Sequence, residues 1–506
     1  MQETILRYRL AQLASVFITA SIGWSTAPAQ VATAPDSIIS RFKPAEDAAP
    51  SAAKADLQAL RERGKQAGWK FAVGYTSAFA MPLKKIAATR IPDNFLALAI
   101  AQNELAAKTN SAADESARLA GVTPPEFLAP CDPDAVAFNW RDQNMISDPQ
   151  SQGAYCGSCW AFTAAATYDA AYRIRNKLPV AVSEQHILNC AVDQDGSKAG
   201  SCDGGWYDPV FRWMFSTGAA TNAQMPYQGV VQPCAATQKG SFRAVSSGYV
   251  TTKYAIPLTR EIKQSICRYG AISAAIEATT AFQAYTGGYF NERSNGPINH
   301  AVTIVGWNDN AGGVGEGAWL VKNSWGTDWG EKGFIWVDYQ SNKIGYAATW
   351  VRPIESGVPV PAKALASAWA ESVPRLQAAQ QVVDPSINTL GKAVLPFQAY
   401  TDDVSGAKKT VWIQYGNSDQ KGQAQALREQ FSKAGYFAPA VEDVSRKGGK
   451  VPNQFQVRYF RESDKQVATR LAAQIASSGF GSPKVVRLAA PTGVDSIEVW
   501  FPRVGK

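Results

Sequence analysis

The pattern of apolar and polar positions changes twice within the first 130 residues. An uncharged and largely apolar run covers residues 10–24, and a stretch rich in Ala, Pro and Ser follows it as far as Asp56. From Asp56 the apolar spacing is helical, residues 69–75 alternate as in a strand, and residues 93–102 have the pattern of an amphipathic helix. We therefore expect a flexible leader, with ordered structure beginning near Leu57.

The last third of the chain has a second pattern of this kind. Residues 353–408 are rich in Pro, Ala, Gln and Val, which predicts a linker with one helix. Beyond the linker we expect strands at 410–415, 454–460, 484–488 and 496–501, and helices at 423–434 and 465–477. This order predicts a small α+β sandwich domain over residues 409–506. In element order and size it resembles the SPOR-like modules that bind cell-wall peptidoglycan.

Composition supports a multidomain globular protein. The chain has 506 residues, of which 46% are hydrophobic and 18% charged, a composition that excludes wholesale disorder. The net charge is +8, and residues 351–506 contribute +7 of it. A basic, aromatic-containing tail is compatible with binding to an anionic envelope polymer, although aromatic residues at strand spacing also form cores. There is no nucleic-acid-binding motif.

Residues 1–29 have the organisation of a secretory signal peptide. Two arginines precede the apolar run, and Ala27-Pro28-Ala29 supplies a small-residue cleavage site. A membrane anchor is the alternative, but a spanning helix needs about 20 apolar residues. No later segment reaches that length without charge, so we expect a secreted protein, periplasmic or extracellular, with no membrane span and with stable disulfides.

The cysteines point to the chemistry. All seven lie between Cys131 and Cys267, and an odd number leaves at least one thiol outside complete pairing. Cys156-Gly-Ser-Cys159-Trp160 begins an apolar, Ala-rich stretch that predicts a helix with Cys159 in its first turn, where a thiolate is favoured. A redox pair or half of a zinc site is the alternative, but a second Cys-x-x-Cys motif is missing, so we expect no metal and no cofactor.

A thiol nucleophile needs a base, and the chain has two histidines. His186 follows a capping-type Ser183 and precedes Cys190, which predicts a structural role in a packed helix. His300 lies 141 residues after Cys159, at the start of an apolar strand. Asn323 follows the next apolar run, and its amide can orient an imidazole.

Together these motifs resemble the papain-like cysteine peptidases over residues 131–352. The resemblance implies an α+β, two-lobed fold, with a helical lobe, a β-barrel-like lobe and a cleft between them. It also implies that Cys159 is the nucleophile, His300 the general base and acid, and Asn323 its orienting partner. Gln152 would stabilise the oxyanion with the backbone N–H of Cys159. Gln152 departs from the family pattern, because it lies seven residues before Cys159 where six are usual.

The same resemblance assigns substrate-binding residues. Gly204 and Gly205 would run alongside the peptide backbone, and Trp325 would cover the His300–Asn323 hydrogen bond. The pocket for the residue before the scissile one would be lined by Trp206, Tyr207, Ala275 and Ala301. Two aromatic residues and two alanines favour a hydrophobic or aromatic substrate side chain.

The six remaining cysteines have 15 possible connectivities. The resemblance implies the bridges Cys156–Cys202 and Cys190–Cys234. Cys131 and Cys267 lie outside the usual pattern, and they either form a third bridge or leave Cys267 as a buried free thiol.

By position, residues 30–130 correspond to an inhibitory propeptide. Residues 70–79 loosely resemble the propeptide stretch that precedes the part lying in the cleft, and we expect removal near residues 120–132. A permanently attached N-terminal domain is the alternative.

The expected function is a secreted cysteine endopeptidase, made as a zymogen, that hydrolyses protein and peptide substrates through a thioester acyl-enzyme. A catalytically inactive peptide-binding homologue and an acyltransferase on the same fold are the competing hypotheses.

Overall fold

The computed structural model describes most of the chain. The described residues are 40–234, 240–381, 410–433, 438, 441–444, 451–460, 464–488 and 496–502. The predicted signal peptide and its cleavage site lie outside them. None of the helices in these ranges is long and apolar enough to cross a membrane.

Ordered structure begins earlier than the composition of the leader predicts. The N-terminal elements are α2 (Lys43–Ala48), α3 (Ser51–Ala67), β1 (Lys70–Val73), α4 (Leu83–Ile86) and α5 (Phe95–Leu119). The expected start near Leu57 is therefore wrong. Alanine favours helix wherever tertiary contacts anchor it, and here Phe42 is buried while Glu46 forms an ion pair of 2.7 Å with Arg61 on α3.

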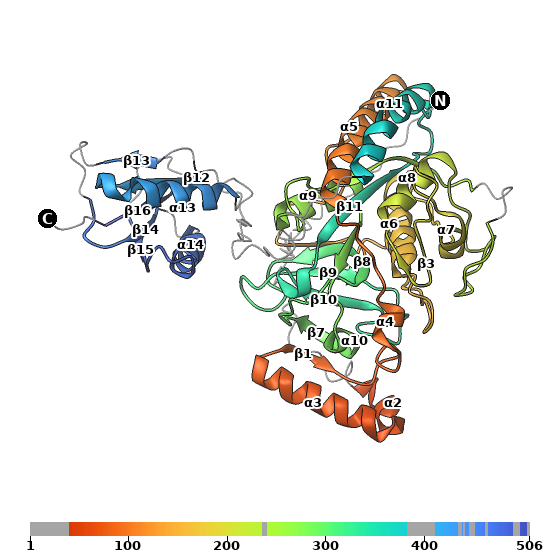
Figure 1. Ribbon diagram of the computed structural model, residues 1–506, viewed down its shortest axis with the longest axis horizontal. Helices are drawn as coiled ribbons and strands as arrows, with labels where there is room; N and C mark the ends of the chain where they lie inside the picture. The colour runs from red at the N-terminus through yellow and green to blue at the C-terminus, as the bar shows by residue number, and fades with distance from the viewer. Residues whose placement is uncertain are drawn as a thin grey trace, which may run out of the picture.

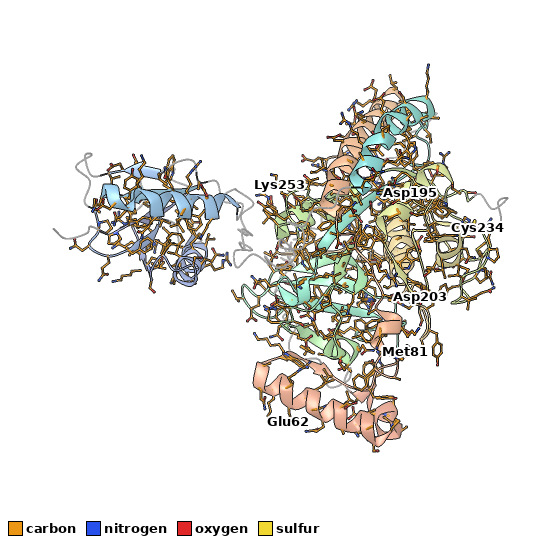
Figure 2. All side chains as sticks on the ribbon, in the orientation of Figure 1. Glu62, Met81, Asp195, Asp203, Cys234 and Lys253 are labelled. Carbon is orange, nitrogen blue, oxygen red and sulfur yellow. A yellow bond between two sulfur atoms is a disulfide. The ribbon has the colours of Figure 1, made fainter. Side chains whose placement is uncertain are left out.

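The helical lobe is built around one buried helix. It contains α6 (Cys159–Asn176), α7 (Glu184–Cys190), α8 (Asp208–Ser216) and the short pair β3 (Gly200–Ser201) and β4 (Gly204–Gly205). Helix α6 packs against α7 and α8 on one side and against strands of the other lobe on the other (Figure 1). Small alanines along α6 permit this burial. Figure 2 marks Asp195 and Cys234 within this lobe.

The second lobe is a sheet in which, among the described residues, nine strands take part. Its strands after β1 are β2 (Ala137–Asn139), β5 (Ala244–Tyr249), β6 (Ile272–Ile276), β7 (Tyr285–Phe290), β8 (His300–Asn308), β9 (Ala318–Lys322), β10 (Phe334–Asp338) and β11 (Tyr346–Pro353). The order is β1-β7-β10-β9-β8-β6-β11-β5, with β2 on β8. Helices α9 (Thr259–Tyr269) and α10 (Thr280–Gln283) complete the lobe. Every residue of β8 is buried, which suits a central strand covered on both faces.

Strand β1 makes the N-terminal segment part of this sheet. It pairs antiparallel with β7, with Lys70 opposite Tyr289 and Phe71 opposite Gly288. The strand-like alternation of residues 69–75 thus corresponds to a real strand, at the edge of the peptidase sheet. Helix α3 lies next to it, and Figure 2 marks Glu62 on that helix.

The residues after β11 return to the body of the molecule. Helix α11 (Ala362–Gln380) is the one helix expected between residues 353 and 408. It lies side by side with α5 in Figure 1, and Leu376 and Leu98 belong to one apolar cluster between the two helices. The linker expectation is therefore wrong for residues 362–380, because the small, apolar positions of α11 form a packing face.

The C-terminal unit has its own sheet and core. Its elements are β12 (Thr410–Tyr415), α13 (Lys421–Lys433), β13 (Val441–Asp443), β14 (Gln456–Tyr459), α14 (Lys465–Ser477), β15 (Lys484–Arg487) and β16 (Ser496–Trp500). The sheet order is β13-β12-β16-β14-β15, and the core includes Val411, Leu427, Leu471 and Val499. The expected elements are all present, and among the described residues β13 and the short 3₁₀ helix η2 (Ser418–Gln420) were not foreseen.

The disulfide pattern matches the expectation in full. Cys156–Cys202, Cys190–Cys234 and Cys131–Cys267 are bridged, and Cys159 is the one free cysteine. The alternative of a free Cys267 is wrong. The third bridge joins the chain entering the peptidase lobes to α9, over a sequence separation of 136 residues.

Candidate active site

Cys159 occupies the first position of a buried helix. It begins α6, as the sequence predicts, and its side chain is fully buried. The free N–H groups of a helix N-terminus carry partial positive charge, which stabilises a thiolate. The packing of α6 against β8 brings this end of the helix toward the strand that begins with His300.

His300 and Asn323 form the second part of the site. His300 Nε2 lies 2.8 Å from Asn323 Oδ1, and both side chains are buried. The indole of Trp325 stacks on the His300 ring, with ring centroids 4.6 Å apart. Because Asn323 occupies Nε2, Nδ1 is the ring nitrogen of His300 that is left for the Cys159 thiol. The structure therefore brings together the three side chains that the sequence predicts for the site.

The environment of Cys159 favours its ionised form. Burial alone raises the pKa of a thiol, but the neighbouring His300 and hydrogen bonds from the Thr89 side chain and the Ala88 backbone outweigh it. The pKa of Cys159 is lowered from 9.0 to about 7. Thr89 Oγ1 lies 3.2 Å from Cys159 Sγ. A thiol with this pKa is substantially ionised at neutral pH, as a nucleophile requires.

Gln152 is held with its amide at the site. Its Nε2 donates to the backbone oxygens of Cys156 at 2.9 Å and Ile86 at 3.1 Å, and its Oε1 accepts from Ser324 Oγ at 2.7 Å. The residue that lengthens the spacing to Cys159 is accommodated in an outward loop. Tyr155 is 83% exposed, and Gly153 adopts a positive φ of 74° that permits the turn.

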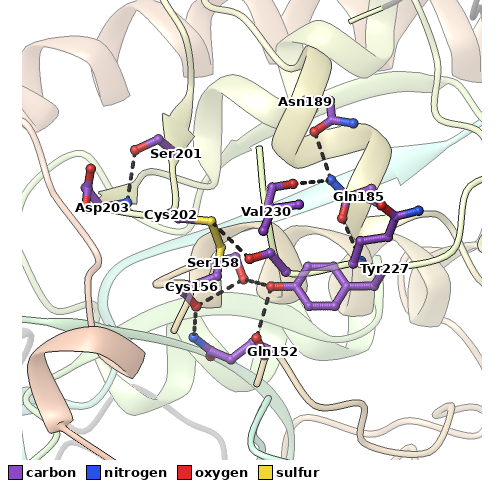
Figure 3. Close-up of a disulfide and its surroundings, with 12 residues drawn as sticks. Gln152, Cys156, Ser158, Gln185, Asn189, Ser201, Cys202, Asp203, Tyr227 and Val230 are labelled. Carbon is purple, nitrogen blue, oxygen red and sulfur yellow. Dashed lines mark hydrogen bonds between the residues drawn. A yellow bond between two sulfur atoms is a disulfide. The ribbon is translucent and has the colours of Figure 1, made fainter. Parts of the chain in front are cut away.

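Tyr227 is a site residue that no motif in the sequence indicates. Its hydroxyl donates to the backbone oxygen of Gln152 at 3.0 Å and lies 2.6 Å from the Ser158 hydroxyl (Figure 3). One side chain from a distant loop therefore ties together both ends of the segment between Gln152 and Cys159. The Cys156–Cys202 bridge fixes the same segment from the other side (Figure 3).

Gly204 and Gly205 lie against an extended stretch of this same chain. Gly205 N donates to Ala88 O at 3.2 Å, and Arg90 N donates to Gly205 O at 2.9 Å. A Cβ on Gly204 would be 2.1 Å from Ala88 O, so only glycine permits this approach. The two glycines therefore present a backbone edge to an extended peptide, which is the arrangement predicted for substrate.

The four residues predicted to line a substrate pocket share one apolar cluster. Trp206 and Tyr207 have ring centroids 3.9 Å apart, and Ala275 is paired with Ala301 across β6 and β8. All four are buried, and Ile91 packs against the cluster that contains them. The geometry is that of an apolar wall beside the extended segment.

His186 lies in the helical lobe, as part of its packing. It is fully buried, its Nδ1 accepts from Ala220 N at 3.0 Å, and its backbone N–H donates to Ser183 Oγ. The structural role predicted for it is confirmed, and His300 is the histidine beside Asn323.

A cavity of about 250 Å³ has Asn323 in its lining. Its lining includes Asp169 of α6, Glu184 of α7 and Lys322 of β9, so it lies where the two lobes meet. Burial raises the pKa of both carboxyl groups and lowers the pKa of Lys322 to about 8. Within the described ranges there is no group of His, Cys, Asp and Glu side chains that could hold a metal ion.

Two parts of the chain match protein families. Residues 135–354 match the papain family of cysteine proteases, and residues 407–487 match the SPOR domain. Cathepsin Z of Onchocerca volvulus is 32% identical over 246 residues, which are 43% of this chain and 78% of that protein. Fruit bromelain of Ananas comosus is 33% identical over 204 residues, 39% of this chain and 53% of bromelain.

Solved structures include relatives of the same kind. The bromelain protease from Ananas comosus in complex with the E64 inhibitor is 29% identical, with a TM-score of 0.38 over 43% of this chain and 98% of that one. The alignments span only about half to three fifths of the length of fruit bromelain and of the Sarcophaga peregrina cathepsin L. The match to cathepsin Z covers most of that relative, and the chain therefore belongs to the papain family of cysteine proteases, with a SPOR domain following at residues 407–487.

Proposed function

We propose that this chain is a secreted cysteine endopeptidase, made as a zymogen, that hydrolyses peptide bonds at Cys159. The observation that carries the proposal is the joint placement of a low-pKa thiol at a helix N-terminus and an imidazole oriented by Asn323. A protein that only binds peptides needs neither. The fold supplies both from separate lobes, Cys159 from α6 and His300 from β8.

The catalytic steps follow from these positions. The Cys159 thiolate attacks the scissile carbonyl carbon, and the developing oxyanion accepts hydrogen bonds from Gln152 Nε2 and the Cys159 backbone N–H. Protonated His300 then gives its proton to the leaving amine, which leaves a thioester on Cys159. His300 next takes a proton from water, and the resulting hydroxide attacks the thioester and releases the acid product.

The zymogen proposal rests on the segment that occupies the site. Thr89 contacts the nucleophile, Ile86 O accepts from the Gln152 amide, and Ala88 and Arg90 pair with Gly205. A substrate needs the same four groups of the enzyme, which are the Cys159 thiol, the Gln152 side-chain amide, and the backbone N–H and C=O of Gly205. The enzyme is therefore blocked by its own residues 86–90 until this segment leaves.

The decisive experiment compares the processed wild type with Cys159→Ala on a peptide library. We expect cleavage products from the wild type and none from the variant. Mass spectrometry of the products separates hydrolysis from acyl transfer, because hydrolysis leaves a free acid whereas transfer leaves a new amide or ester. Cleavage that persists in Cys159→Ala, or a processed wild type with no activity, would overturn the proposal.

The proposal also covers the compartment of the protein and the ligand of its SPOR domain. Three disulfides in one peptidase domain suit an oxidising compartment outside the cytosol. The SPOR domain would bind peptidoglycan through the sheet face opposite its core. That face carries the half-exposed Trp412 and the Arg458 guanidinium, which lies 4.3 Å from the centre of the Trp500 ring. Aromatic and guanidinium planes can stack on sugar rings.

A further inference from the structure

Helix α5 lies inside the stretch that corresponds by position to a removable prosegment, yet it is integrated into the peptidase. Asn103 makes two hydrogen bonds to the backbone of Tyr249 in β5, donating through Nδ2 at 2.9 Å and accepting through Oδ1 at 2.7 Å. Gln102 Nε2 donates to Ser247 O at 2.8 Å. Side-chain amides thus satisfy backbone groups of the edge strand β5, as a neighbouring strand would.

Further contacts to α5 come from the end of β11 and from α11, which follows the peptidase lobes. Asn94 Nδ2 donates to the backbone oxygens of Ala379 and Gln380 at the end of α11. Arg352, largely buried at the end of β11, donates to Asp114 at 2.7 Å. Leu376 of α11 is fully buried in the cluster shared with α5. Removing α5 would expose this apolar surface and leave Arg352 without one of its two carboxylate partners.

The first turn of α5 also packs into the apolar cluster that contains the predicted pocket residues. The Phe95 ring lies 5.3 Å from the Tyr346 ring, and Phe95 is buried in the cluster that contains Trp206, Ala275 and Ala301. These last residues form the apolar wall described above. Phe95 therefore belongs to the same apolar cluster as the pocket wall, and removing α5 would take a buried side chain out of that cluster.

The segment that blocks the active site is attached to a different part of the molecule. Residues 41–90 are held by the edge pairing of β1 with β7, by burial of Leu57 and Ile86 in the core of the sheet lobe, and by ion pairs such as Lys70–Glu316. Between this segment and α5 lie residues 90–93, of which Arg90 and Asp93 are exposed. A peptidase can reach the chain there.

We propose that activation cleaves the chain between Arg90 and Asn94, and that α5 stays in the active enzyme, clamped by α11 and β5. The inference rests on the proposed zymogen function and places the cleavage upstream of residues 120–132. The step is hydrolysis, in which water adds across one peptide bond to give a carboxylate and an amine. A cut in the largely exposed residues 121–126 alone leaves the blocking segment tethered through α5 at high effective concentration.

Two full-length variants test this directly. One carries a recognition site for a sequence-specific protease between Arg90 and Asn94, and the other carries the same site within residues 121–126. After complete cutting, we expect at least tenfold more titratable active sites in the first variant, measured with a thiol-directed epoxide probe. Activity in the second variant with loss of residues 40–120 would overturn the inference.

The same two cuts in a Cys159→Ala background separate this inference from the proposed function. Native mass spectrometry reads fragment retention without catalysis. We expect the fragment that ends at residues 121–126 to remain bound, whereas the fragment that ends at residues 90–94 dissociates on gel filtration. Separate elution of the α5-containing fragment would refute the retention of α5, whatever the catalytic assay shows.

Discussion

Thr89 shows how a blocking residue can tune the nucleophile it covers. Its hydroxyl lies 3.2 Å from Cys159 Sγ and contributes to the lowered pKa of the thiol. Thr89→Val keeps the shape and removes the hydrogen bond, so the pKa of Cys159 should rise from about 7. The pH dependence of thiolate ultraviolet absorbance in the intact zymogen, with Cys159→Ser as the blank, measures this. Thr89→Ser should retain the low pKa, and an unchanged pKa in the valine variant would contradict the assignment.

Variants of Gln152 and Tyr155 distinguish the role of the Gln152 amide from the effect of its longer spacing to Cys159. Gln152→Ala removes the side-chain donor proposed for the oxyanion, so kcat/KM of the activated enzyme should fall about a hundred- to thousandfold. Deletion of Tyr155 restores the shorter spacing and removes an exposed residue, so activity should change by less than about threefold. Steady-state kinetics on one peptide substrate checks both. Equal losses of kcat/KM in the two variants would contradict the oxyanion role of the Gln152 amide. Activity would then depend on the conformation of the loop between Gln152 and Cys159.

The residues that could be predicted from sequence are reactive or polar side chains within a recognisable local motif. Cys159, His300 and Asn323 each lie in such a motif, and the structure places them together. Tyr227 and Thr89 could not be found in this way, because their contacts join segments 69–75 residues apart and depend on the fold. A Tyr or Thr in a loop has no periodicity or spacing that marks such a role.

At the scale of elements, the pairing of α5 with α11 is the feature with the clearest energetic consequence. Leu376→Ala empties a fully buried position between the two helices, and such truncations cost about 2–5 kcal/mol. Leu119→Ala, at an 80% exposed position on α5, is the matched control and should change stability by less than about 0.5 kcal/mol. Chemical denaturation of both variants in the Cys159→Ala background measures this. Equal stability of the two variants would mean that α11 does not clamp α5.

Element prediction succeeded where periodicity reflects burial on one face. The helix at residues 465–477 and the strand at 410–415 have the expected bounds. Prediction failed for residues 43–56, which were expected to be a flexible leader, and for residues 362–380 it gave the helix but not its packing against α5. The Ala-rich composition of both stretches is compatible with linker and with helix. Tertiary anchors such as Phe42 and Leu376 decide between the two states, and a local pattern does not contain them.

At the scale of the whole molecule, the peptidase lobes and the SPOR domain have separate cores. If the SPOR domain binds peptidoglycan through its open sheet face, Trp412→Ala in the full chain should weaken binding to purified sacculi roughly tenfold, since one stacked aromatic ring is lost. Hydrolysis of a soluble peptide should be unchanged, because Trp412 is outside the peptidase cores. Tyr155→Ala removes an exposed aromatic ring from the peptidase side and should leave sacculus binding intact. Cosedimentation with sacculi measures both variants. Equal binding by the Trp412 variant and the wild type would exclude this face as the binding surface and direct attention to the helices on the opposite side of the sheet.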